Sequence, residues 1–268
     1  MKPRRFAMLL FFVVMLALLA SVPGPQGKDA TPRVGLAGAF GAELDALREG
    51  LSLTHTVTAG GTDYTVGRVG DREVVLIHAG PGMVNAAARI QHAADHFTLT
   101  HLIFSGVAGG LDPDLPLGAV VVPERWINHQ FGAVTDDGFA PMPLDIRPFG
   151  GTPVALTGFD VDAALFEIAG NLSGVDAGGV GVSGDVFINS AAERQRLSDQ
   201  FGPRIVDMES AAAGQVAYLN DLPFIAVRAV SDYAGDEALA QITASVNEGA
   251  RAAARMVIEM VGRMPQAE

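Results

Sequence analysis

The chain has 268 residues, of which 49% are hydrophobic and 18% charged, with a formal net charge of −12 and no cysteine. This composition excludes an intrinsically disordered chain, and the length is sufficient for one large or two small domains. The acidic balance argues against nucleic-acid binding, and the lack of cysteine excludes disulfides, a thiol nucleophile and a thiolate zinc site.

Residues 1–22 differ from the rest of the chain. Three basic residues in the first five positions precede an unbroken apolar run over Phe6–Ala20, and a stretch of small residues, Pro and Gly follows. This pattern is typical of a secretory signal peptide, and the run is shorter than the roughly 20 residues of a membrane span. The sequence therefore predicts export to a periplasm or the cell exterior. An uncleaved anchor is the alternative, and no membrane association is expected after signal removal.

From Arg33 onward, short apolar runs alternate with helical patterns. In chain order we predict a strand at Val34–Ala39, a helix beginning at Ala42–Leu47, strands at His55–Thr58, Tyr64–Val69 and Glu73–His78, a helix at Val84–His96, and strands at His101–Ser105 and Ala119–Val122. After a long loop at Asn128–Pro153 we predict a helix at Val161–Ala169, a strand at Gly178–Val182, a helix at Ala191–Phe201, a strand at Arg204–Asp207, a helix at Ser210–Tyr218, a strand at Phe224–Val230 and a closing helix at Ala238–Met264.

This alternation predicts one fold class. Strands that alternate with helices indicate a three-layer α/β/α fold, with a central mixed, mostly parallel sheet covered on both faces. No linker divides residues 33–264, so we expect a single domain.

Polar residues follow several of the predicted strands. Open α/β sheets bind ligands beyond the carboxyl ends of their strands, so these segments are candidate sites. Taken singly, each residue also has a structural explanation, with Glu43 and Glu209 as first-turn acids, Asp232 as a cap and Phe187 as core. The segments are 38–43, 105–110, 183–189, 206–210 and 230–233.

Several chemistries lack their motif in this sequence. There is no GxGxxG, GxxxxGK[ST], HExxH or GxSxG pattern, and the glycines of the GVAGG stretch at 106–110 can be interpreted as turn residues. His92 and His96 lie four residues apart on a predicted helix and could share a metal ion, although surface histidines are the favoured interpretation. We therefore expect neither a metal nor an organic cofactor.

In their order along the chain, the strand-end segments resemble the nucleoside phosphorylase superfamily, and most closely its hydrolytic branch, the 5′-methylthioadenosine/S-adenosylhomocysteine nucleosidases. The resemblance spans Val34 to about Ala234 and is carried by the strings VGLAGAFGAEL, SGVAGGL, VSGDVFIN, VDMES and VRAVSDYAG. It implies a nucleoside phosphorylase-like fold and cleavage of the N-glycosidic bond of an adenine-type nucleoside.

The resemblance implies two catalytic groups. The family's transition state resembles a ribosyl oxocarbenium ion that is leaving a purine anion. Asp232 would be the acid that protonates the purine at N7, and Ser231 would orient it. Glu43 would be the base that activates the attacking water. An acid of this kind should hold its proton near neutral pH, so burial should raise the pKa of Asp232.

The resemblance also implies the residues that bind substrate. Glu209 would bind the 2′- and 3′-hydroxyls, and Met208 would pack beneath the sugar. Phe187 would stack on the purine, while the backbone of Ile188 would read its Watson–Crick edge. Arg228 would support the site from behind, near Glu209.

Some positions depart from the family pattern. Phe40 replaces a methionine near the ribose, Val107 stands where the nucleosidases carry Ser, and Pro81 replaces an aliphatic residue at the 5′ substituent. Gly109, in the same string as Val107, is a further candidate substrate contact. The PERWINHQFGAVTDD segment resembles secreted relatives, including plant storage proteins. We expect the purine chemistry to be retained, with the preference for the 5′ substituent open.

Two alternatives to hydrolysis follow from the same family. A phosphorylase needs a cationic cradle, yet residues 79–85 and 106–110 contain no Arg or Lys. A secreted nucleoside-binding or storage protein with little catalysis would not need Glu43, Glu209 and Asp232 together. We therefore favour hydrolysis. The resemblance further implies that the protein is a homodimer. It also implies that the ligand is a small purine nucleoside.

Overall fold

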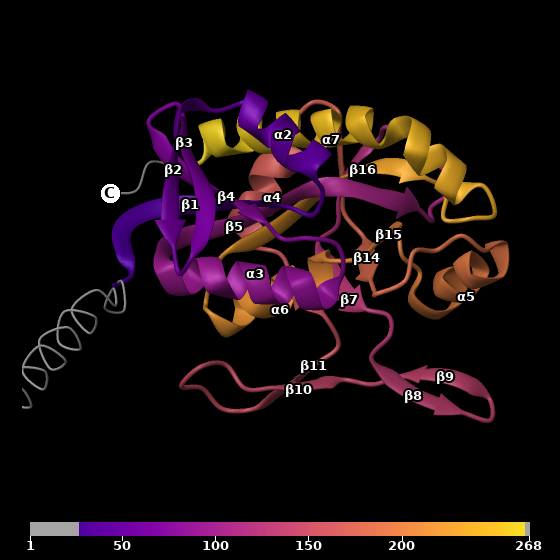
Figure 1. The fold of residues 1–268 in the computed structure, drawn as a ribbon. Coiled ribbons are helices and arrows are strands. Elements are labelled where there is room, and N and C mark those ends of the chain that lie inside the picture. Colours follow the sequence, from indigo (N-terminus) through magenta and orange to yellow (C-terminus); the bar gives the residue numbers. More distant parts are fainter. Residues whose placement is uncertain (1–26, 266–268) are drawn as a thin grey trace, which may run out of the picture.

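A computed structural model of the chain describes residues 27–265 (Figure 1). The predicted signal peptide at 1–22 lies outside these described residues. The helices are α2 (Gly41–Glu49), α3 (Met83–His96), α4 (Ala163–Gly170), α5 (Ala191–Phe201), α6 (Ser210–Leu219) and α7 (Ala238–Arg263). Within the described residues, no helix combines the length and apolar content needed to cross a bilayer.

Most strands belong to one mixed sheet of 12 strands. Its longest path runs β12-β7-β14-β15-β5-β1-β4-β3-β2, and β16 pairs with both β5 and β6. The strands are β1 (Asp29–Gly38), β2 (Ser52–Ala59), β3 (Thr62–Val69), β4 (Arg72–His78), β5 (Phe97–Gly110), β6 (Val120–Val122), β7 (Arg125–Asn128), β8 (Gly132–Thr135), β9 (Gly138–Pro141), β10 (Leu144–Ile146), β11 (Val154–Leu156), β12 (Phe159–Asp160), β13 (Val175–Ala177), β14 (Val180–Ser183), β15 (Ile205–Asp207) and β16 (Phe224–Asp232).

The centre of the sheet is parallel and its margins are antiparallel. β1 pairs in parallel with β4 and β5, and β5 pairs in parallel with β16, whereas β2, β3 and β4 form an antiparallel meander. Parallel neighbours need long crossover connections, which helices such as α3 supply. The predicted α/β fold with a mixed sheet is confirmed.

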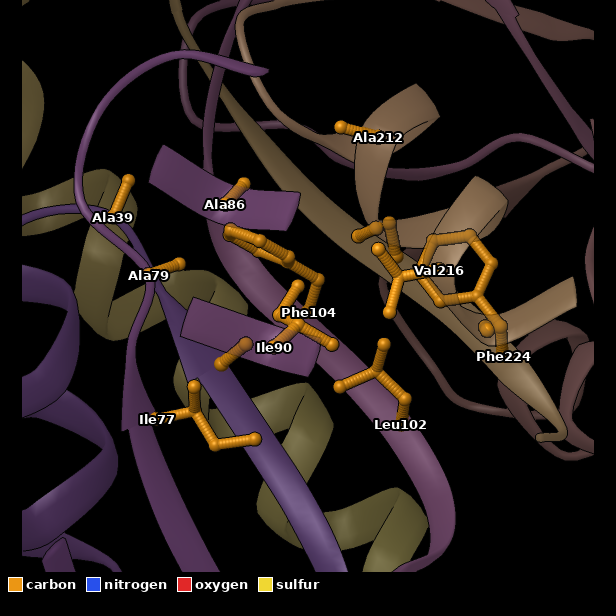
Figure 2. Close-up of a cluster of buried hydrophobic side chains, with 14 of the residues drawn as sticks. Ala39, Ile77, Ala79, Ala86, Ile90, Leu102, Phe104, Ala212, Val216 and Phe224 are labelled. Carbon is orange, nitrogen blue, oxygen red and sulfur yellow. The ribbon is translucent and has the colours of Figure 1, made fainter. Parts of the chain in front are cut away.

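Helices cover both faces of the sheet, with α3 and α6 on one side and α2 and α7 on the other (Figure 1). Figure 2 shows the cluster beneath α3 and α6, in which Ile90 and Val216 lie near Ile77, Leu102 and Phe104 of the strands. Each fully buried aliphatic side chain of this kind stabilises the fold by about 1.5–3 kcal/mol. Two apolar layers therefore hold the sheet that carries the strand ends.

The α3 helix shows why the spacing of apolar residues along the chain predicts helices well. Its buried residues are Ala86, Ile90, Ala93 and Ala94, which recur at the spacing of one helical face. The three alanines let the helix axis approach the sheet closely. The predicted span of Val84–His96 differs from the observed helix by one residue at its start.

The predicted long loop at Asn128–Pro153 is wrong in part. This region contains the β8–β9 hairpin and the strand β10, which pairs with β11. Both hairpins extend from the body of the molecule (Figure 1). Their strands have only three or four residues each, which is too short for alternation to be recognised.

The predicted end of the central strand at Ser105 is also wrong. β5 continues to Gly110, so Gly106, Gly109 and Gly110 are strand residues and not turn residues. Glycine within a strand often marks a close approach of another group. At Gly106 the approaching groups are the side chains of Glu43 and Arg228, which leave no room for a Cβ atom.

Candidate functional site

A cleft lies at the carboxyl ends of β1, β5, β14, β15 and β16. This position is where open α/β sheets bind ligands. The lining residues are Phe40, Val107, Ala108, Gly109, Val186, Phe187, Ile188, Val206, Asp207, Met208, Glu209, Ser231, Asp232, Ala234 and Ile242.

The cleft gathers most of the residues singled out in the sequence. Those that line it are Phe40, Val107, Gly109, Phe187, Ile188, Met208, Glu209, Ser231 and Asp232. Glu43 and Arg228 lie behind this lining and contact it through hydrogen bonds and ion pairs. Pro81 borders a neighbouring pocket with Asn85 and Arg89 instead.

Glu43 is a buried carboxylate at the start of α2. One of its oxygens accepts hydrogen bonds from the backbone N–H groups of Ala39, at 2.6 Å, and Phe40, at 3.1 Å. The other accepts from the N–H of Val107 at 3.0 Å. Burial raises the pKa of Glu43, and the charge of Arg228 together with the three N–H donors opposes that rise. The side chain therefore combines a desolvated position with donors that favour its ionised form.

Asp232 is a buried carboxyl group at the end of β16. It accepts a hydrogen bond from the Ser231 hydroxyl at 2.8 Å and another from the Ala234 N–H at 2.9 Å. The backbone of Ala234 has φ +50°, which turns the chain back over the carboxyl group. Burial raises the pKa of Asp232, which suits a group that must deliver a proton near neutral pH.

Glu209 and Asp207 line the floor of the cleft, and Arg228 lies directly behind them. The Nη2 atom of Arg228 lies 2.7 Å from an oxygen of Asp207 and 3.5 Å from an oxygen of Glu209. The other Glu209 oxygen accepts from the N–H of Gly82 at 3.0 Å, and burial raises the pKa of Glu209 to about 7. The Arg228 guanidinium also lies over the Phe104 ring, 4.4 Å from its centroid.

Asp207 is a site residue to which the sequence assigned no role. It accepts hydrogen bonds from the hydroxyls of Ser183 and Ser210 and from the N–H groups of Glu209 and Ser210, which open α6. With Arg228 it fixes the position of the strand end that carries Glu209. The sequence pattern that could have identified Asp207 is its position directly after an apolar strand, in the string VDMES. Ile242 of α7 and Gly82 also contribute to the site, but no sequence pattern identifies them.

The outer wall of the cleft is apolar and partly exposed. Phe187 is 39% exposed and Val186 lies beside it, whereas Ile188 is buried. Phe40 forms part of the opposite lining and is also exposed. Phe187 is therefore not a core residue, and its accessible ring offers a planar ligand a surface on which to stack.

The chemistry of the cleft is that of carboxyl groups. None of its described lining residues is Lys or Arg. Within residues 27–265 there is no group of three or more His, Asp or Glu side chains placed to hold a metal ion. The arrangement places the buried carboxyl groups of Glu43, Glu209 and Asp232 beside an aromatic wall.

Comparison with known proteins gives consistent matches. The family model described as Phosphorylase superfamily matches residues 33–262. A curated 5′-methylthioadenosine/S-adenosylhomocysteine nucleosidase from Mycobacterium tuberculosis is 32% identical over 216 residues, which cover 74% of this chain and 84% of that protein. Its counterpart from Geobacillus kaustophilus is 31% identical over 241 residues, covering 87% and 98%.

Solved structures of such nucleosidases share the fold. The enzyme from Neisseria meningitidis, in complex with methylthio-immucillin-A, is 29% identical with a TM-score of 0.75 and covers 87% of this chain and 99% of its own. The enzyme from Streptococcus pneumoniae, bound to a transition-state inhibitor, is 26% identical with a TM-score of 0.76 and covers 85% and 98%. Because the family model matches most of the chain, this protein belongs to the phosphorylase superfamily.

Proposed function

We propose that this protein is an N-glycosyl hydrolase that cleaves adenine-type nucleosides of the 5′-methylthioadenosine/S-adenosylhomocysteine class into free base and a ribosyl product. The observation that carries the proposal is the placement of Asp232 and Glu209 in one cleft, with Glu43 directly behind it. The named relatives, which are nucleosidases of this class, support the same substrate class.

Asp232 supplies the proton in the proposed reaction. It protonates N7 of the purine as the glycosidic bond breaks, so that the base leaves as a neutral molecule. Ser231 and the N–H of Ala234 hold the carboxyl group in place. The purine ring stacks on the exposed face of Phe187, and the backbone of Ile188 meets its Watson–Crick edge.

Glu43 acts on the opposite side of the sugar as the base that activates water. An ionised carboxylate has about four lone-pair sites, and backbone N–H groups occupy three of those of Glu43. The remaining site accepts a hydrogen bond from the attacking water. As the water bonds to C1′ of the ribosyl cation, Glu43 takes its proton.

Glu209 binds the sugar between these two groups. Its carboxylate accepts hydrogen bonds from the 2′- and 3′-hydroxyls, and Met208 packs beneath the ring. Asp207 and Arg228 keep Glu209 in position, since Arg228 pairs with both carboxylates. This contact fixes C1′ between the acid and the base.

Water is favoured over phosphate as the nucleophile. A phosphate dianion needs cationic side chains in contact with the substrate cleft, and the described lining residues include no Lys or Arg. Arg228 lies behind the lining and is already paired with Asp207. Its charge is therefore directed at the carboxylates and not at an incoming anion.

The proposal is tested by product analysis. The chain without residues 1–22 is incubated with methylthioadenosine, S-adenosylhomocysteine, adenosine or inosine, with and without phosphate, and the base and sugar products are separated by chromatography. We expect adenine and a free ribosyl sugar at the same rate in both buffers. Base release that requires phosphate, or release from none of the four nucleosides, would refute hydrolysis.

We also propose that the protein is exported. The basic start, the apolar run and the small-residue exit within residues 1–22 support this, because that order is the one signal peptidase pathways recognise. The test is a fusion of residues 1–30 to a reporter enzyme that is active only outside the cytosol. An inactive, cytosolic fusion would contradict export.

A homodimer is the third part of the proposal. The hairpins that extend from the body carry accessible apolar side chains, and Val134 is 87% and Phe149 69% exposed. These side chains are available for contact with a second copy of the chain. Light scattering after gel filtration should give twice the chain mass, and a monomer at micromolar concentration would contradict the proposal.

A further inference from the structure

We infer that Asp185 is a positioning residue, which ties the segment that carries Phe187 to the ribose-binding side of the cleft through the first turn of α3. The inference rests on the proposed function, because it names a group that holds two of the proposed binding residues relative to each other. Asp185 is not among the residues that line the cleft, so its effect on a ligand must pass through residues that are.

The residue proposed to stack on the purine lies on a segment without regular secondary structure. Residues 184–189 follow β14 and belong to no helix or strand. Within the described part of the chain, residues 186–189 make no backbone–backbone hydrogen bond. This leaves the backbone of Ile188 free to meet a purine edge, but it also means that side chains must hold the segment. Ile188 packs in an apolar cluster, whereas Val186 and Phe187 are exposed.

The carboxylate of Asp185 holds the start of this segment. Its Oδ1 atom accepts a hydrogen bond at 2.6 Å from the N–H of Met83, the first residue of α3. The N–H of Asp185 donates to Oε1 of Gln130, also at 2.6 Å. First-turn N–H groups have no partner within their helix, and the helix dipole favours a negative charge at this end. Because a charged acceptor makes such a bond about twice as strong as a neutral one, it can fix an exposed side chain.

The preceding N–H group, that of Gly82, binds the proposed ribose ligand. It donates to Oε1 of Glu209 at 3.0 Å, so consecutive N–H groups at the start of α3 hold carboxylates that follow two different strands. Gly82 has φ +90°, and a Cβ atom there would lie 2.9 Å from Oδ1 of Asp185. The helix start therefore sets the spacing between the Phe187 segment and Glu209.

The chain offers a matched control in Asp162. This residue also accepts a hydrogen bond from a first-turn N–H, that of Leu165 in α4, at 2.9 Å. Its own N–H pairs with Phe224 at the start of β16, whereas Asp232 ends that strand. At about 3.3 Å per residue, the strand places Asp162 about 25 Å from the cleft. Asp162→Ala thus removes the same kind of bond far from the ligand.

Isothermal titration with methylthioadenosine measures the effect on binding. The parent and all variants carry Asp232→Asn, so that the nucleoside binds without being cleaved. We expect Asp185→Ala to weaken binding about tenfold and Asp162→Ala to weaken it less than about twofold. Asp185→Asn should lose about threefold or less, because its Oδ1 still accepts from Met83. Circular dichroism checks that each variant is folded.

A double-mutant cycle separates positioning from a general loss of stability. If Asp185 acts through Phe187, the loss caused by Asp185→Ala should shrink from about tenfold to about twofold when Phe187→Ala is already present. Equal losses in both backgrounds, or binding by Asp185→Ala that equals that of the parent, would overturn the inference. No binding by the parent would overturn the proposed function as well. Binding with this coupling, but no cleavage by the natural chain, would support the inference and refute hydrolysis alone.

Discussion

Glu43 and Asp232 are both buried carboxyl groups, yet their hydrogen bonds differ. Three backbone N–H groups donate to Glu43, whereas one hydroxyl and one N–H donate to Asp232. Arg228 adds a positive charge near Glu43 only. Hydrogen bonds and cations that favour the ionised form assist a base, and desolvation with fewer of them and no cation assists an acid. The surroundings thus divide the two roles.

Replacement of the proposed acid separates chemistry from folding. Asp232→Asn retains the shape of the side chain but cannot protonate the purine. We expect kcat to fall by a factor of about 100 or more, with an unchanged circular dichroism spectrum. A kcat within a few-fold of the natural enzyme would refute the role of Asp232.

The pH dependence of kcat/KM follows from the buried carboxyls. Burial raises the pKa of Glu209 to about 7, and a protonated Glu209 cannot accept both ribose hydroxyls. We therefore expect kcat/KM to fall about tenfold per unit below pH 7, and to fall again at high pH as Asp232 ionises. Measurement from about pH 5 to about pH 9 tests this. A flat profile between about pH 5 and pH 7 would show that Glu209 does not change protonation in this range.

The ion pair between Asp207 and Arg228 should matter for stability, because both partners are buried at 2.7 Å. Asp207→Asn leaves the Arg228 charge poorly compensated, at a cost of about 3–5 kcal/mol in the free energy of unfolding. Asp160→Asn is the control, since Asp160 is 72% exposed in its pair with Arg125 and should cost about 1 kcal/mol or less. Chemical denaturation measures both. Equal losses would contradict the buried pair's importance.

At the scale of elements, β5 contributes to the site through its glycines, which lack a side chain. A Cβ on Gly106 would lie 2.5 Å from Glu43 Oε1 and would overlap Arg228 Nη1. Both groups are held by other partners and cannot withdraw easily. The strand therefore brings its backbone directly against the proposed base and the arginine.

Two glycines of β5 allow this to be tested. Gly106→Ala should destabilise the fold by about 1–3 kcal/mol and lower kcat about 100-fold, because it displaces Glu43. In Gly110→Ala the nearest atom is a methyl group of Val230 at 3.0 Å, which can shift, so kcat should change little. Thermal unfolding and steady-state kinetics measure both effects. Equal kinetic losses would show that β5 does not position the base.

Elements with clear periodicity were predicted well, and the others were not. The apolar spacing of α3 predicts its span to within one residue. The strands of β8 and β9 have four residues each, so their pairing depends on contacts along a short hairpin and not on a repeating pattern. The carboxyl-terminal half of β5 resembles a turn in sequence because it is rich in glycine. These glycines are strand residues that leave room for neighbouring side chains.

At the scale of the whole molecule, one sheet connects the two apolar layers. Phe104 of β5 faces the layer beneath α3 and α6, and its neighbour Ile103 faces the layer beneath α2 and α7. If the helices on either face unfolded, apolar side chains of the same strands would be exposed to water. We therefore expect the two layers to unfold together.

We expect the chain without residues 1–22 to unfold in one transition. Scanning calorimetry should give equal calorimetric and van't Hoff enthalpies per folded unit. The proposed dimer makes the midpoint depend on protein concentration but does not split the transition. Two separated transitions would show that residues 33–264 contain more than one cooperative unit.

The sequence by itself determined the α/β class and most helices, because hydrophobic periodicity is a local property of the chain. It also carried the family resemblance, since the strings at the strand ends keep their order, and the family is confirmed by the match over residues 33–262. The same strings contain most of the residues that line the cleft.

Only the tertiary structure decided which groups meet. The Gly82 N–H reaches Glu209 across 127 residues, and Asp207 pairs with Arg228 from the next strand. The two histidines of α3 pack against Gly60 of a distant turn. Contacts of this kind depend on strand register and helix packing, which are set by the whole core. The local sequence pattern predicts which secondary structure each segment forms. The packing of the helices on the sheet determines which side chains come into contact.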